Sequence, residues 1–223
     1  MRDVAIPLDA AVELTRTGDL WLFRGHSAAD RAIRVTTNAP VNHVGMAVVL
    51  DDLPPLMWHA EIGKSLIDMW SGKYQRGVQL HDLRDSVLVW ANKYGQHGWL
   101  RQLDRVVSRA AEDAVLKTIA RLDGTPFPTT RALAAGWIGG RLPQNARPGA
   151  DNRETAYCAE VVAMTYQDMG LLAKSRKASW YDPGKFWSGD DLDLLGGFTL
   201  SGEIPIEIPL EFPAGPPHVN SSM

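Results

Sequence analysis

The chain has 223 residues, a formal net charge of −3, 45% hydrophobic residues and 22% charged residues. This composition is typical of a folded globular protein and excludes wholesale disorder. At roughly 150 residues per domain, the length predicts one domain with extensions. The small negative charge gives no overall attraction to DNA or RNA, so we expect no nucleic-acid partner.

The sequence predicts no integral membrane segment. Its longest run of apolar residues and glycine, residues 44–50, is far shorter than the roughly 20 residues of a membrane helix. Asp3, Asp9 and Glu13 interrupt the stretch where a secretory signal needs an apolar core, so we expect no signal peptide. The expected location is the cytoplasm, or the protein is delivered by another route, for example by a phage. A single cysteine excludes an intrachain disulfide and fits a reducing compartment.

Short strands dominate the predicted structure of the first half of the chain. Residues 8–14 follow the start as a helical turn, and Ser27 is a suitable N-cap for a helix over 27–37. Residues 43–50 and 56–62 are joined by a proline-containing connection and form an antiparallel candidate pair. Residues 65–70 are helical or irregular. The expected strands are 19–23, 43–50, 56–62, 77–80 and 86–91.

Helices dominate the prediction for the second half. Apolar residues recur at helical spacing over residues 100–122, and Gly124 ends this helix. A further helix is predicted over 129–137. Residues 141–152 contain two prolines and no periodicity, which favours a loop. The last predicted helix is 155–172, with Thr155 as its N-cap.

A repeated Glu-apolar-Pro unit marks the C-terminal segment, residues 203–213. In an extended strand, the isoleucines share one face and the prolines remove N–H donors from one edge only. We therefore expect an edge strand or a docking arm, which either packs on its own domain or binds a protein partner. The predicted division is a lead-in over 1–16, a main domain over 17–190 and an extension over 191–223.

Cys158 is the first candidate for chemistry. The predicted helix places it in a first turn, where free N–H groups and the helix dipole favour the thiolate. A reactive thiolate needs a neighbouring base, for which histidine is the natural choice. The alternative is that a lone cysteine is a small buried hydrophobic residue.

His43 and His59 are the candidate bases. His43 opens one strand of the predicted antiparallel pair and His59 lies in the other, so the two rings can be neighbours. His59 and Glu61 share a face of their strand, and either can orient His43 as the third member of a triad. The other histidines are expected to be solvated or structural: His26, His81, His97 and His218.

Six short motifs occur in an order that resembles circularly permuted papain-like cysteine hydrolases. This is the NlpC-type group, with YiiX-like proteins and lecithin:retinol acyltransferase-like enzymes as branches. The likeness covers about residues 17–187. The motifs are Gly18-Asp-Leu-Trp-Leu-Phe-Arg-Gly25, Asn42-His-Val-Gly-Met46, Trp58-His-Ala60, Gly77-Val-Gln-Leu80, Gly124-Thr-Pro-Phe127 and Tyr157-Cys-Ala-Glu160.

The resemblance implies an α+β fold in which a small antiparallel sheet or barrel packs against the cysteine-bearing helix. It implies Cys158 as nucleophile, His43 as base and His59 as third member. That third place is usually Glu in YiiX-like members and His in the acyltransferase branch, and Glu61 remains a substitute. Tyr157 would border the substrate cleft. No cofactor or metal is expected.

The implied reaction is acyl transfer through a thioester, with the backbone N–H of Cys158 as oxyanion donor. The substrate is the amide of a peptide, such as a peptidoglycan stem peptide, or the ester of a lipid acyl group. One alternative is a non-catalytic binding or assembly module on the same fold, whose C-terminal strand docks a partner. A third interpretation is a zinc site formed by Cys158, His43 and His59.

Overall fold

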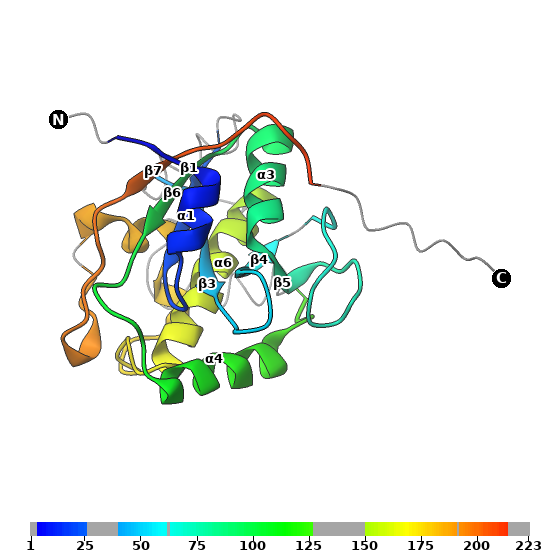
Figure 1. Ribbon diagram of the computed structural model, residues 1–223. Helices are drawn as coiled ribbons and strands as arrows, with labels where there is room; N and C mark the ends of the chain where they lie inside the picture. Colours follow the sequence, from blue (N-terminus) through cyan, green and yellow to red (C-terminus); the bar gives the residue numbers. More distant parts are fainter. Residues whose placement is uncertain (1–3, 26–39, 62, 127–149, 191, 214–223) are drawn as a thin grey trace, which may run out of the picture.

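A seven-stranded sheet with helices on both faces forms the centre of the protein (Figure 1). The structure is a computed structural model. The predicted helices at 27–37 and 129–137 lie outside the described residues. For residues 150–156 and 190 the backbone alone is described. The described residues are 4–25, 40–61, 63–126, 150–190 and 192–213.

The strand order is β1-β7-β6-β2-β3-β4-β5. All neighbours are antiparallel except β1 and β7, which run parallel. The predicted pairing across the Pro-Pro connection is confirmed, because Met46 of β3 lies opposite Trp58 of β4. The strands are β1 Ile6–Pro7, β2 Leu20–Arg24, β3 His43–Val48, β4 Leu56–Glu61, β5 Gly77–Asp82, β6 His97–Arg101 and β7 Ile204–Glu207.

Four α-helices and four short 3-10 helices lie in the described ranges. Helix α6 packs along β3 and β4 with α4 beside it, whereas α1 and α3 cover the other face (Figure 1). None of the described helices has the length and apolar character that a bilayer crossing needs. The helices are α1 Leu8–Leu14, α3 Leu83–Tyr94, α4 Arg109–Leu122, α6 Ala150–Asp168, η1 Ala178–Trp180, η2 Pro183–Phe186, η3 Ser188–Asp190 and η4 Leu195–Gly197.

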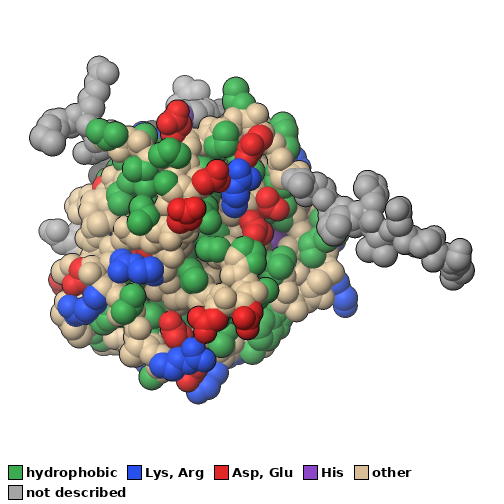
Figure 2. All heavy atoms as spheres, in the orientation of Figure 1, with side chains coloured by type: hydrophobic (Ala, Val, Ile, Leu, Met, Phe, Trp, Pro, Cys, Tyr) green, Lys and Arg blue, Asp and Glu red, His purple; other side chains and the backbone are tan. Residues whose placement is uncertain are grey.

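Side-chain alternation divides the core into two clusters, one on each face of the sheet. Val44 and Trp58 belong to the cluster beneath α6. Ala47 and Met57, of the opposite parity, belong to the cluster that contains Trp90 of α3. The outer surface in Figure 2 has acidic and basic side chains interspersed, with no broad area of one charge on that face.

The strand predicted at residues 86–91 is wrong, because this segment lies in the middle of α3. The side chain of Asp82 accepts a hydrogen bond from the N–H of Asp85 and caps the helix start. Gly95, at φ 65°, ends it in the left-handed conformation. The apolar residues over 87–90 are buried in the core. A continuous apolar run of this length occurs both in buried strands and in buried helices, so the sequence pattern alone does not separate the two.

The helix predicted over residues 100–122 begins later than expected. Ser108 caps α4 by accepting a hydrogen bond from the N–H of Ala111, so the helix starts at Arg109. Leu100 lies instead in β6, where it faces Trp21 of β2. The apolar residues of β6 and of α4 happen to follow each other at helical spacing, so the sequence pattern predicted one helix across both elements.

Helix α6 starts at Ala150 rather than at Thr155, so the predicted loop is wrong over its last three residues. Residues 150–156 contain no glycine or proline, and they extend the helix by more than a turn. Thr155 is therefore an interior residue and no N-cap. Cys158 lies in the third turn of α6 and not, as predicted, in the first.

The C-terminal repeat contributes an inner strand. β7 pairs with β1 on one side and with β6 on the other, so it is no edge strand at Ile204–Glu207. The isoleucines share a face, as predicted, and pack against the cluster that contains Trp90. Leu210 and Phe212 are 98% and 67% exposed. The repeat therefore docks on its own domain up to Ile208.

Candidate functional site

His43 and His59 are brought together beneath α3. Their ring centroids are 5.5 Å apart and the rings meet edge to face. Trp90 of α3 contacts both imidazoles, with centroid distances of 4.6 Å and 4.7 Å. Both histidines are buried. The prediction that the antiparallel pair makes the two rings neighbours is confirmed.

Gly45 permits this close approach of β3 and β4. A Cβ atom at this position would lie 2.3 Å from Met57 Sδ and 3.5 Å from His59 Cβ. The absence of a side chain thus leaves room for the residues of β4 on the α3 face. The close packing of β3 against β4 therefore explains why a glycine occupies position 45 of the His43-Val-Gly motif.

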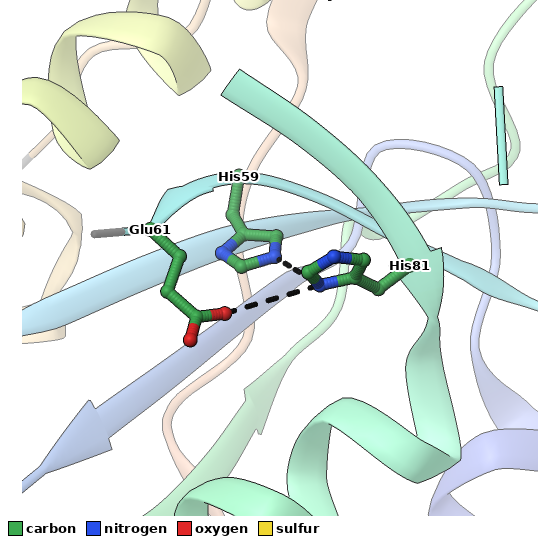
Figure 3. A group of neighbouring side chains, drawn as sticks. All are labelled: His59, Glu61 and His81. Carbon is green, nitrogen blue, oxygen red and sulfur yellow. Dashed lines mark hydrogen bonds and ion pairs between the residues drawn. The ribbon is translucent and has the colours of Figure 1, made fainter. Parts of the chain in front are cut away.

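A chain of contacts continues from His59 to His81 (Figure 3). From His81 it continues to Gln79. His59 Nε2 lies 3.0 Å from His81 Nδ1, and His81 Nε2 lies 3.1 Å from Gln79 Oε1. The Gln79 amide nitrogen donates to the backbone carbonyls of Glu61 and Gly77, which turns its oxygen toward His81. His81 Nε2 therefore carries the proton, and Nδ1 accepts one from His59.

Glu61 completes this cluster. Its Oε1 accepts a hydrogen bond of 3.0 Å from Ser65, while Oε2 lies 3.9 Å from His81 Nδ1 and has no hydrogen-bond partner. Burial raises the pKa of Glu61, although the hydrogen bond from Ser65, the nearby Trp90 and the charge of Lys93 lower it. A buried carboxylate with so little compensating charge is costly for the fold.

The three histidines of the cluster are neutral at pH 7. Burial lowers the pKa of His43 to about 3 and that of His81 to about 4. Burial also lowers the pKa of His59 well below 6.5, and His81 and His43 add to the effect. The Glu61–His81 contact is therefore no pair of full charges. Neutral imidazoles can accept a proton or bind a metal ion.

Two hydrogen bonds fix where α6 lies on the sheet. Trp58 Nε1 donates to Thr165 Oγ1 at 3.0 Å. The hydroxyl of Tyr166 donates to the carbonyl of Gly18. The N–H of Gly18 in turn donates to the carbonyl of Ala47, near the C-terminal end of β3. Because α6 runs along β3 and β4, its earlier turns lie toward the end where β3 starts. Cys158, about two turns before Thr165, lies toward that end.

Cys158 is fully buried and belongs to the hydrophobic cluster beneath α6, as do Val161 and Val162 of the same helix. The rings of His43 and His59 lie on the other face of the sheet. The described residues thus bring His43, His59 and Glu61 together but leave the sulfur across β3. The predicted zinc set of Cys158, His43 and His59 is not assembled.

The expected oxyanion donor is also wrong. In the third turn of a helix the N–H of Cys158 faces the preceding turn rather than a substrate.

Tyr157, predicted to border a substrate cleft, is 5% exposed. Burial, together with the charge of Glu160, raises the pKa of Tyr157 to about 12.

Sequence reasoning missed His81, Gln79 and Trp90. The predicted strand at 77–80 stopped one residue short of His81, although alternation along β5 places His81 and Gln79 on one face. Trp90 was assigned to a strand and could not be placed over the histidines. Of the histidines expected to be solvated or structural, His81 belongs to this group of buried polar side chains and His97 is exposed, whereas His26 and His218 lie outside the described residues.

Comparison with known proteins gives a distant structural likeness. No family model and no curated protein matches the chain. The crystal structure of the metalloprotein YiiX from Escherichia coli O157:H7 is similar at 20% sequence identity, with a TM-score of 0.45. The match covers 70% of this chain and 66% of that one, slightly under two thirds. The fold class is α+β, and a likeness at this level does not establish a common family.

Proposed function

We propose that the protein is a cysteine-dependent hydrolase or acyltransferase, with Cys158 as nucleophile, His43 as base and His59 as the residue that orients it. The contact between His43 and His59 is the observation that carries the proposal. The ordered motifs of the sequence support it, as does the position of Cys158 toward the end of the sheet where His43 starts β3.

In the proposed reaction, His43 takes the proton of the Cys158 thiol, and the sulfur attacks an amide or ester carbonyl. The carbon–nitrogen or carbon–oxygen bond breaks as His43 returns the proton to the departing amine or alcohol. Water or another acceptor then attacks the thioester, and the thiol is restored. Burial lowers the pKa of His43 to about 3, so the ring is neutral at pH 7 and is a weak base in its present position.

The proposal makes one demand on the structure. The thiol of Cys158 and the ring of His43 lie on opposite faces of β3, so catalysis requires a rearrangement at the start of this strand. His43 is the first residue of β3, so its place is set by the start of this strand. A rotation of His43, or a shift of the first turns of α6, would bring the two groups into one crevice.

Detection of the covalent intermediate tests the function. The full chain is incubated with a peptide amide, an isopeptide and a lipid ester, and its intact mass is measured after rapid quenching. An acyl group on Cys158, together with product release, supports the proposal. Cys158→Ala should form no adduct, and His97→Ala, in an exposed histidine of β6, serves as the matched control. No adduct from any substrate contradicts it.

A non-catalytic binding module is the second candidate, because a specific observation favours it. Cys158 is fully buried in the hydrophobic cluster beneath α6, in the third turn of its helix, which is the usual environment of a structural cysteine. On this alternative, thiol reagents label Cys158 no faster than a model thiol. Since β7 already pairs on both sides, a partner strand would have to bind elsewhere than at 204–207.

A further inference from the structure

We propose that His59, Glu61 and His81 form a binding site for a divalent metal ion of the zinc type. The three side chains come from the adjacent strands β4 and β5 and point into one space beneath α3 (Figure 3). One ligand atom from each lies within 4.8 Å of the others, and all three residues are buried. The site shares His59 with the proposed catalytic residues, but it includes neither Cys158 nor His43.

The distances suit a shared ion. Two ligands that each lie about 2.1 Å from one ion are about 3.0 Å apart at a right angle and about 3.4 Å apart at the tetrahedral angle. His59 Nε2 and His81 Nδ1 are 3.0 Å apart. Glu61 Oε2 lies 3.9 Å from His81 Nδ1, so a shift of about 0.5 Å brings it to the tetrahedral separation.

The protonation of the cluster leaves lone pairs at this point. Gln79 accepts the proton of His81 Nε2, which directs the lone pair of Nδ1 at the shared space. Such a hydrogen bond to the second ring nitrogen is the usual way in which proteins orient a metal-bound histidine. If an ion replaced the proton between the two rings, the proton of His59 would move to Nδ1, an atom that has no hydrogen-bond partner among the described residues.

The charge balance also favours a cation. Glu61 Oε2 is buried without a hydrogen-bond partner among the described residues, and His81 Nδ1 lies 3.9 Å from it. A divalent ion would compensate the buried carboxylate and occupy the lone pairs of both rings. Two histidines and one carboxylate are a ligand set that proteins use for zinc.

Metal analysis of the full chain tests the site. The protein is stripped with a chelator, dialysed against Zn²⁺ and freed of excess metal; its zinc content and thermal midpoint are then measured. We expect about one zinc ion per chain and a higher midpoint than in the stripped protein. His81→Gln should lose the ion and the shift, whereas His97→Gln should keep both. Gln79→Met should weaken binding about 10–100-fold.

A measurement on the wild type covers the case in which a buried variant fails to fold. Co²⁺ is added in place of Zn²⁺, and the visible spectrum is recorded for the wild type and for Cys158→Ser. Bound Co²⁺ without a thiolate charge-transfer band, and with the same spectrum in Cys158→Ser, supports the assignment. A thiolate band overturns it in favour of Cys158 as a ligand. Failure of the stripped wild type to bind either metal, or equal loss in His97→Gln, also overturns it.

Discussion

His59 contacts His43 edge to face while its Nε2 lies 3.0 Å from His81, so one imidazole links two neighbouring groups. On one side is the histidine proposed as the catalytic base. On the other are the two residues proposed to share a metal ion with His59. Replacing His59 should therefore affect both turnover and metal content, and replacing His43 should affect turnover alone.

Variants of the three predicted catalytic positions should differ in severity. Cys158→Ala and His43→Ala should abolish turnover, because each removes a group that reacts directly. His59→Ala should reduce kcat/KM less, because an orienting residue contributes less than the nucleophile. Circular dichroism provides the control for folding. If His59→Ala is silent and Glu61→Ala is not, then Glu61 is the third member.

The stability of the protein should fall in mild acid because of His43. Burial lowers the pKa of His43 from 6.5 to about 3, so between these pH values the unfolded chain binds a proton that the folded protein does not. This contribution is present in full above pH 6.5 and is lost as the pH falls toward 3. Urea unfolding from pH 7 to 5 should show a shallower loss in His43→Asn, by up to about 1.4 kcal/mol per pH unit. Parallel pH profiles of the two proteins would contradict this.

Thr165 should be important for the attachment of α6 to the sheet. Thr165→Val leaves the buried N–H of Trp58 without its acceptor, which costs about 1–3 kcal/mol in the free energy of unfolding. Chemical denaturation measures the loss, and Thr199→Val, at an exposed position, should change stability little. Equal stabilities of the two variants would show that this hydrogen bond does not anchor the helix.

The C-terminal segment should stabilise its own domain. Removing residues 203–223 deletes β7, exposes facing edges of β1 and β6, and uncovers the cluster that the isoleucines cover. The thermal midpoint should fall, and a peptide of residues 203–213 added in excess should restore part of the loss. An unchanged midpoint would mean that the segment does not hold to this domain in solution.

The sequence was sufficient for the parts of the fold that local patterns determine. Alternating apolar residues and the Pro-Pro turn predicted β3, β4 and their pairing, and with it the contact of His43 with His59. The apolar residues at 86–91 show no periodicity that distinguishes a helix from a strand. The residues that cap α3, Asp82 and Gly95, were not recognised as helix ends. The start of α6 was also missed, and with it the position of Cys158 in the helix.

The proposed metal site could not be predicted for a different reason. His81 and Glu61 are brought together by the register of β4 against β5, which sequence spacing alone does not show. The close packing at Gly45 and the hydrogen bonds of Gln79 are likewise properties of the assembled sheet. They become visible only when the partner of each strand is known.

The rate at which a thiol reagent labels Cys158 near neutral pH tests the proposed function most directly. The wild type should be labelled faster than a model thiol, and His43→Ala should lose that advantage while His97→Ala keeps it. Labelling that is slow in the wild type and unaffected by the loss of His43 would show that sulfur and imidazole do not meet, and would contradict the proposed hydrolase.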